Sequence, residues 1–218
     1  SSWIVAARRS VSSGDSSAAV RPSAGSIRLR GVEIATLAPD RRARMGIGRS
    51  YQKTNIFPGF SVLENARMAA QSRRPRPWAL FADAARDAVA LDRGRRGLEL
   101  AGLAEHVERQ AGALSHGEQR QLEIAMVLAT EPEVLLLDEP LAGMGAEESR
   151  RMVGLLRRLA ADHAILLVEH DMDAVFALAD VITVMVNGQV LESGPPAQIR
   201  ASEQVQRAYL GHGEDGGG

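Results

Sequence analysis

The sequence contains no cysteine, which excludes disulfides, thiolate metal sites and cysteine nucleophiles and fits a reducing compartment. Long apolar runs are lacking as well. Runs such as Val134–Leu137 and Ala164–Val168 are far shorter than the roughly 18 residues that a membrane-spanning helix requires. We therefore expect any role at a membrane to depend on partner subunits.

An excess of charge of either sign is also lacking. The 26 lysine and arginine residues nearly balance 27 aspartate and glutamate residues, so the formal net charge is −1. Without an overall positive field, the composition gives no support for a nucleic-acid partner. With 218 residues, 45% of them hydrophobic, the chain can build one sizeable core or two small ones.

Lysine is nearly absent, because Lys53 is the only one in the chain. A phosphate-binding P-loop, Gly-x-x-x-x-Gly-Lys-Ser/Thr, needs glycines that let backbone N–H groups wrap the phosphates and a lysine that reaches the β and γ oxygens. Lys53-Thr54 follows Gln52 rather than a glycine, and Ile47 stands where the first glycine would be. The 218 residues therefore contain no P-loop motif.

The most informative stretch is a run of four aliphatic residues, Val134–Leu137, followed by Asp138 and Glu139. The run predicts a strand buried on both faces that ends in two adjacent carboxylates. Nucleotide hydrolysis needs this pair: Asp138 would hold Mg²⁺ through its water shell, and Glu139 would polarise the attacking water. An ordinary buried strand with a polar turn has the same pattern, so this stretch alone leaves both interpretations open.

A second candidate site lies at Ser115-His116-Gly117, where Ser115 is a good N-cap for a helix that continues through Glu131. The free N–H groups at the start of such a helix favour an anion by about 0.3 to 2 kcal/mol. Most helix caps only start helices, however. The buried stripe expected for this helix comprises Leu122, Ala125, Met126 and Ala129.

The strand predicted at Ala164–Val168 ends in Glu169-His170-Asp171. If it is a parallel neighbour of the Val134–Leu137 strand, His170 lies at the same sheet edge as Glu139. A single histidine at a strand end is also common as a surface or capping residue. Helices are predicted at 146–161 and 172–178.

Composition divides the chain into segments. Residues 1–25 are rich in serine, alanine and arginine and have no sustained period, so we expect an irregular, disordered or non-native terminus. Residues 26–60 and 113–211 have the pattern of an α/β core. Residues 61–112 predict an inserted helical subdomain, and the glycine-rich residues 212–218 a flexible tail.

Four pieces occur in one order along the chain: Gln52 with the helical insert after it, Leu114–Gln119, Asp138-Glu139, and His170. Together they resemble the ATP-binding subunits of ATP-binding-cassette (ABC) transporters over approximately residues 21–211. The resemblance implies an α/β fold with a P-loop NTPase-like sheet and an inserted helical subdomain.

Further stretches resemble the branch that powers branched-chain amino acid uptake, namely Tyr51–Phe57, Leu141–Met144 and Gln206–Gly211. A related ATPase subunit of lipopolysaccharide export ends similarly and remains an alternative. The resemblance implies ATP and Mg²⁺ as cofactors. Asp138 would serve Mg²⁺, and Glu139 the attacking water.

The resemblance implies further roles in nucleotide binding. His170 would contact the γ-phosphate and the transition state, and Gln52 would sense the γ-phosphate and Mg²⁺. Ser115 and Gly117 would contact the γ-phosphate of ATP held by a second ATP-binding subunit, identical or different. The implied partners also include transmembrane subunits, which would place the chain in the cytoplasm, peripherally on the inner face of the plasma membrane.

In the family, the P-loop would precede a segment like Arg21–Gly25. We therefore expect a chain that is N-terminally truncated relative to the family, with an exposed sheet edge where the first strand is missing. Losing about four charge-assisted hydrogen bonds of roughly 1.5 to 3 kcal/mol each would lower ATP affinity by some four decades. We expect weak ATP binding and little or no turnover by the chain alone.

Three hypotheses remain open. The chain is an altered copy of a working transport ATPase, a non-catalytic partner that lends Ser115 and Gly117 to an intact subunit, or a remnant that serves only as a soluble interaction module.

Overall fold

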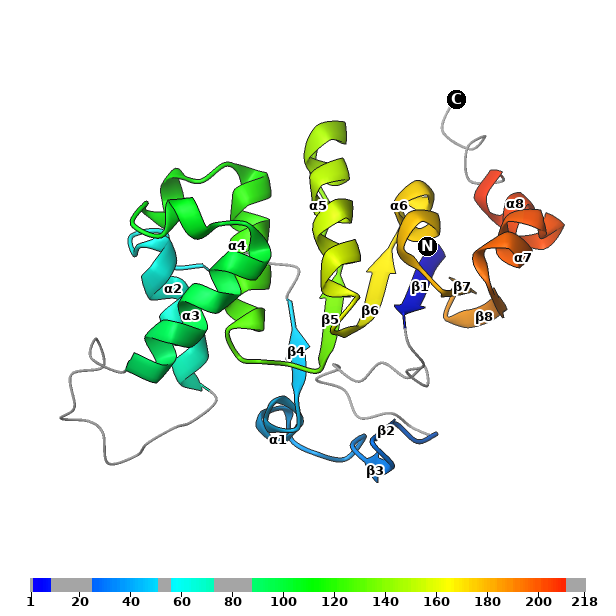
Figure 1. Ribbon diagram of the computed structural model, residues 1–218. Helices are drawn as coiled ribbons and strands as arrows, with labels where there is room; N and C mark the ends of the chain where they lie inside the picture. Colours follow the sequence, from blue (N-terminus) through cyan, green and yellow to red (C-terminus); the bar gives the residue numbers. More distant parts are fainter. Residues whose placement is uncertain (1, 9–24, 51–55, 73–87, 211–218) are drawn as a thin grey trace.

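The computed structural model describes residues 2–8, 25–50, 56–72 and 88–210 (Figure 1). Its main element is a six-stranded sheet in the order β4-β5-β6-β1-β7-β8. The strands are β1 (Ser2–Arg8), β4 (Ile47–Arg49), β5 (Val134–Asp138), β6 (Ala164–Glu169), β7 (Val181–Val186) and β8 (Gln189–Gly194). Strands β4, β5 and β6 are parallel, whereas β1 runs antiparallel to both β6 and β7. The three parallel strands β4, β5 and β6 therefore form one half of the sheet.

The β1 strand corrects one sequence prediction. Residues 1–25 were expected to be irregular and to leave a sheet edge exposed, but Ser2–Arg8 pairs along β6 on one side and β7 on the other. The apolar run Trp3–Val5 is too short to show a period, so sequence pattern could not identify the strand. The segment becomes a strand because β6 and β7 offer backbone N–H and C=O groups with which it can form hydrogen bonds. The rest of the predicted terminus, residues 9–24, lies outside the described part of the chain, as do residues 212–218.

The core is built around β5, because both faces of this strand are covered. Leu135 and Leu137 face the main hydrophobic cluster, to which α5 (Ala146–Leu159) contributes its apolar stripe. Val134 and Leu136 point the other way and pack with Leu166 of β6. Alternation of side chains across a strand requires this division, and a strand buried on both faces explains the continuous aliphatic run. The α5 stripe comprises Met152, Leu155, Leu156 and Leu159.

Beyond the β4 edge lies a group of helices (Figure 1). The described elements within residues 61–112 are α2 (Val62–Ser72), α3 (Ala88–Ala101) and two short 3-10 turns at Ala104–His106 and Ala111–Ala113. They pack on α4 (His116–Leu128). Gly97 brings α3 against α4 so closely that a Cβ atom there would lie 2.5 Å from the carbonyl oxygen of Ala125.

Smaller elements complete the chain. A hairpin of β2 (Arg28–Leu29) and β3 (Val32–Glu33) precedes α1 (Pro39–Arg44). α6 (Met172–Leu178) lies beside β1, and α7 (Pro196–Ala201) and α8 (Glu203–Leu210) lie at the β8 end of the sheet (Figure 1). Within the described ranges, no helix has the length and apolar character needed to cross a bilayer. The mixed α/β architecture predicted from the sequence is confirmed.

Candidate functional site

Two predicted residues meet where β5 and β6 end. The strands are parallel neighbours in which Asp138 is opposite Val168, so the residues that follow each strand emerge at the same edge. Nδ1 of His170 lies 3.6 Å from Oε1 of Glu139. The Glu139 side chain is 18% exposed and that of His170 is 60% exposed. The pair can therefore reach a ligand from solvent while the carboxylate remains partly enclosed.

Asp138, the last residue of β5, lies beside a residue that sequence reasoning did not single out. The guanidinium NH2 of Arg49 is 3.9 Å from Oδ2 of Asp138, and both side chains are about 30% exposed. Arg49 ends β4, which pairs with β5. An arginine at the last position of an edge strand carries no recognisable motif, so only the strand order shows that it faces the acid. Gln52, the other predicted Mg²⁺ contact, lies outside the described residues.

The donor set at this edge fits one kind of magnesium site. In the described ranges no group of three or more histidine, cysteine, aspartate or glutamate side chains could hold a metal ion. Mg²⁺ in phosphate-transfer sites is usually held by one or two carboxylates, substrate phosphates and water rather than by a complete protein cage. Asp138 alone can meet that requirement, provided that a nucleotide supplies the remaining ligands.

The backbone of Glu139 adopts an unusual conformation, with φ of 46°. Residues other than glycine enter this left-handed region at an energetic cost, and such residues gather at functional sites. The Glu139 N–H donates to the carbonyl of Val168 at 2.9 Å, and its carbonyl accepts from the N–H of Ala142 at 3.1 Å. The first bond ties the turn after β5 to β6, and the second closes the turn itself.

Glu169 was noted in the sequence only as part of a polar strand end. Its side chain is fully buried, and Oε1 accepts a hydrogen bond from the N–H of Leu141 at 2.9 Å. Oε2 accepts from the N–H of His170 at 3.1 Å. Burial of a carboxylate directly before an exposed histidine cannot be inferred from an apolar run, because that run gives no indication of which polar residue turns inward.

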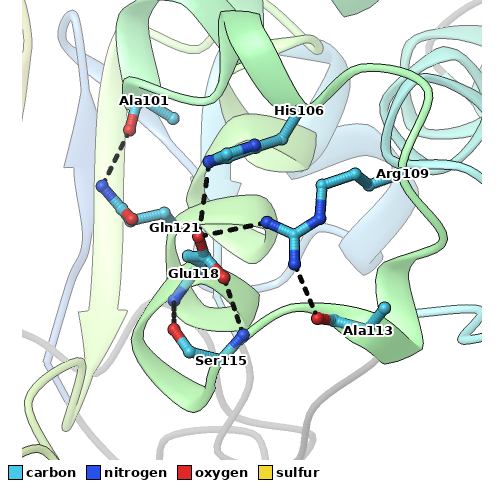
Figure 2. Close-up of polar contacts among 7 residues, drawn as sticks. All are labelled: Ala101, His106, Arg109, Ala113, Ser115, Glu118 and Gln121. Carbon is cyan, nitrogen blue, oxygen red and sulfur yellow. Dashed lines mark hydrogen bonds and ion pairs between the residues drawn. The ribbon is translucent and has the colours of Figure 1, made fainter.

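The other predicted group begins α4, where Ser115 is the N-cap of a reciprocal capping box. Its hydroxyl accepts from the N–H of Glu118 at 3.3 Å, and Oε2 of Glu118 accepts from the N–H of Ser115 at 2.7 Å (Figure 2). This exchange satisfies two N–H groups that would otherwise lack partners at the helix start. The predicted N-cap therefore stands at the start of α4, with its hydroxyl fixed by its own helix.

Glu118 is also held from the preceding segment. Figure 2 shows its Oε1 facing His106 Nε2 at 3.3 Å and Arg109 NH1 at 3.6 Å. The backbone N–H of Ser115 lowers the pKa of Glu118 below its usual value, and the charges of Arg109 and His106 act in the same direction. An ionised Glu118 therefore links the turns before α4 to the Ser115 cap.

Two further hydrogen bonds connect the same parts of the chain. Arg109 donates to the carbonyl of Ala113 at 2.9 Å, and Gln121 donates to the carbonyl of Ala101 at 3.1 Å (Figure 2). The first bond spans the approach to Ser115, and the second ties the end of α3 to α4. The start of α4 is therefore held to the turns before it and to the end of α3.

Glycine residues allow close packing between the start of α4, which carries Ser115, and the segments that follow β5. A Cβ atom on Gly117 would lie 2.8 Å from Oε1 of Glu148 in the first turn of α5. A Cβ atom on Gly143, in the turn that follows Glu139, would lie 3.3 Å from Cε1 of His116. The start of α4 thus packs against the loop that carries Glu139 and against the helix that follows it.

This sheet, with a helical insert and polar groups at the ends of β5 and β6, is the architecture of an ABC transporter ATPase. Residues 17–142 match the ABC transporter family model. The chain belongs to the family of ABC transporter ATP-binding proteins. Within it, residues 189–215 match the model described as branched-chain amino acid ATP-binding cassette transporter, which places the chain in that branch.

Curated relatives agree with this assignment. The high-affinity branched-chain amino acid transport ATP-binding protein LivG of Escherichia coli K12 is 40% identical over 200 residues, covering 88% of this chain and 78% of LivG. BraF of Pseudomonas aeruginosa, which carries the same description, is 36% identical over 198 residues with the same coverage. The family and branch predicted from the sequence are confirmed.

Solved structures give the same fold. The ADP conformation of MJ1267, an ATP-binding cassette of an ABC transporter, superposes with a TM-score of 0.77 at 25% identity, covering 88% of this chain and 79% of that one. A nucleotide-free ATP-binding cassette gives a TM-score of 0.75 at 23% identity, covering 87% and 78%.

Proposed function

We propose that the chain is the ATP-binding subunit that powers the import of branched-chain amino acids. The observation that carries the proposal is the pairing of Glu139 and His170, 3.6 Å apart, beside Asp138 where the parallel strands β5 and β6 end. The branched-chain assignment is supported by relatives such as LivG. The chain would act at the inner face of the plasma membrane, bound to transmembrane subunits that carry the solute.

The chemistry follows from the residues at the ends of the strands. Asp138, together with Gln52, would hold Mg²⁺ on the nucleotide, and the ion when bound neutralises charge on the phosphate oxygens. The Glu139 carboxylate would accept a hydrogen bond from the attacking water and orient it. His170 Nδ1 faces Glu139, which leaves Nε2 as the nitrogen that can donate to the γ-phosphate.

The start of α4 would act on a second subunit. Ser115 is exposed at the N-terminus of this helix, where unpaired N–H groups and the helix dipole favour a phosphate. Gly117, the second helical residue, lets the start of α4 pack closely on Glu148 of α5, because a Cβ atom there would lie 2.8 Å from Oε1 of Glu148. We propose that both residues complete the nucleotide site of the opposing ATP-binding subunit, so that two subunits close face to face on ATP.

The direct test is uptake of radiolabelled leucine by cells whose gene for this protein has been deleted. We expect the initial rate of uptake at low leucine concentration to fall, and a plasmid-borne copy to restore it. Glucose uptake in the same cells is the control for general loss of energy. Unchanged uptake of leucine, isoleucine and valine would contradict the proposed function.

A second candidate function is that of a non-catalytic partner. It is favoured by one observation, the absence of a P-loop motif from the 218 residues, whose only lysine is Lys53. Such a partner would lend Ser115 and Gly117 to an intact subunit without hydrolysing ATP itself. Transport would then be lost on Ser115→Arg and retained on Glu139→Gln, whereas a catalytic subunit loses transport with either substitution.

A further inference from the structure

Glu169 occupies a position that costs free energy unless its carboxylate is fully compensated. Its side chain is completely buried, at 0% exposure. Water is therefore replaced by protein donors: Leu141 N–H on Oε1, His170 N–H on Oε2, and Asp171 N–H on Oε2 at 3.5 Å. Every one of these partners is a backbone N–H donor, which suits an ionised carboxylate with two acceptor oxygens.

The groups that Glu169 joins belong to different strand-end loops. Leu141 lies in the turn after β5, two residues beyond Glu139, whereas His170 is the first residue after β6. Oε1 accepts from the first loop and Oε2 from the second, so one buried carboxylate links the two loops. The Oε2 atom also lies 3.8 Å from Nδ1 of His170, and thus acts on the ring as well as on its backbone.

The loop held by Leu141 is the one that contains the left-handed Glu139, with φ of 46°. A residue in this region persists only where its surroundings fix it. One restraint is the bond from Glu139 N–H to the carbonyl of Val168. A second is the bond from Ala142 N–H to the Glu139 carbonyl, and a third is the bond from Leu141 N–H to Glu169, the one that ties this loop to the end of β6 through a side chain.

We infer that Glu169 is a positioning residue, whose two carboxylate oxygens hold the Leu141 and His170 backbones so that Glu139 stays left-handed beside the His170 ring. The importance of this geometry for hydrolysis rests on the proposed function. Glu123 offers a matched comparison, because its side chain is also buried, at 8% exposure. It pairs with Arg120 of the same helix at 2.9 Å, within α4 rather than at the strand ends.

The test compares Glu169→Gln with Glu123→Gln by amide hydrogen exchange and ¹³C chemical shifts of the purified chain. A glutamine at 169 can accept from Leu141 N–H through its oxygen, but its NH₂ group then faces the His170 N–H, donor against donor. We expect exchange at Leu141 or His170 to accelerate by at least about tenfold, since hydrogen bonds to charged groups are the stronger ones. The Glu139 Cα shift should move away from its left-handed value.

Amides of the strand interior, such as that of Leu136, serve as the internal reference, because a general loss of packing would change them too. Glu123→Gln should leave Leu141, His170 and Glu139 unchanged. Wild-type exchange rates and Glu139 shifts in Glu169→Gln would overturn the inference. If Glu169→Gln does not fold, hydrogen exchange of the wild-type chain still tests the inference. A Leu141 amide that exchanges without protection in the wild-type chain would also overturn the inference. These measurements use no nucleotide. They therefore test the role of Glu169 even if the proposed transport function is wrong.

Discussion

His170 Nδ1 lies 3.6 Å from Glu139 Oε1, although the two residues follow different strands. The parallel pairing of β5 and β6, with Asp138 opposite Val168, brings them together. An imidazole beside a carboxylate can hold that carboxylate in place and can itself be oriented by it. The two side chains therefore form one unit, and changing either of them should affect ATP turnover.

Replacing His170 with alanine should lower ATP turnover by the assembled transporter about 10- to 100-fold, since a hydrogen bond to a charged phosphate contributes roughly 1.5 to 3 kcal/mol. The measurement is the steady-state release of phosphate. His163→Ala is the matched control, because that ring contacts the carbonyl of Leu159 at 3.0 Å and lies just before the opposite end of β6. Equal turnover by the two variants would argue against a role for His170 in the reaction.

The Ser115–Glu118 cap should make stability depend on pH. The Ser115 N–H, Arg109 and His106 hold the pKa of Glu118 below its ordinary value of 4.5 in the folded chain. The stabilisation is therefore present in full above about pH 4.5 and is lost as the pH falls through the lower folded pKa. Urea unfolding of wild type and Glu118→Gln should differ at pH 7 and converge in acid.

For this comparison Glu105→Gln is the control, since Glu105 is an exposed acid in the turn before α4. Its variant should track wild type at every pH. A difference between wild type and Glu118→Gln that stays constant from pH 7 to pH 3 would mean that the ionised carboxylate does not stabilise the cap.

Gly97→Ala should destabilise the chain by about 1 to 3 kcal/mol, because its Cβ atom would meet the Ala125 carbonyl at 2.5 Å and the backbone nitrogen of Ala129 at 3.0 Å. Gly154→Ala, on α5, meets only Arg158 NH1 at 3.9 Å. It should instead stabilise by about 0.5 to 1 kcal/mol through helix propensity. Chemical denaturation measures both, and the same sign of change in the two variants would contradict the packing of α3 on α4.

The 218-residue chain, purified with Glu139→Gln to slow hydrolysis, should bind Mg-ATP weakly. Without a P-loop motif it lacks about four charge-assisted hydrogen bonds, which corresponds to some four decades of affinity. Calorimetric titration should show no binding in the micromolar range. Micromolar binding would mean that residues within the chain replace the missing loop.

Much of the site could be predicted because its elements depend on local signals. The aliphatic run before Asp138 is long enough to specify a buried strand, and Ser115 is the N-cap observed for α4. The meeting of Glu139 with His170 followed from a single topological assumption, that the two strands are parallel neighbours.

What could not be predicted depends on contacts distant in sequence. Arg49 meets Asp138 only because β4 lies beside β5. Glu169 turns inward because Leu141 and His170 offer donors that no pattern reveals. The β1 strand was missed for the same reason, since its pairing partners follow it by more than a hundred residues and its apolar run is too short to show a period.

The most direct measurement is leucine uptake by cells whose chromosomal copy of the gene carries Glu139→Gln, compared with a matched strain that carries Glu147→Gln. Glu147 is an exposed acid in the first turn of α5, where it pairs with Arg151 of the same helix. We expect the Glu139 variant to import leucine at the rate of the deletion strain, since general-base catalysis contributes roughly 10²- to 10⁴-fold, and the Glu147 variant to import it at the wild-type rate. Leucine import at the wild-type rate by the Glu139 variant would contradict the assignment of this chain as the hydrolytic subunit.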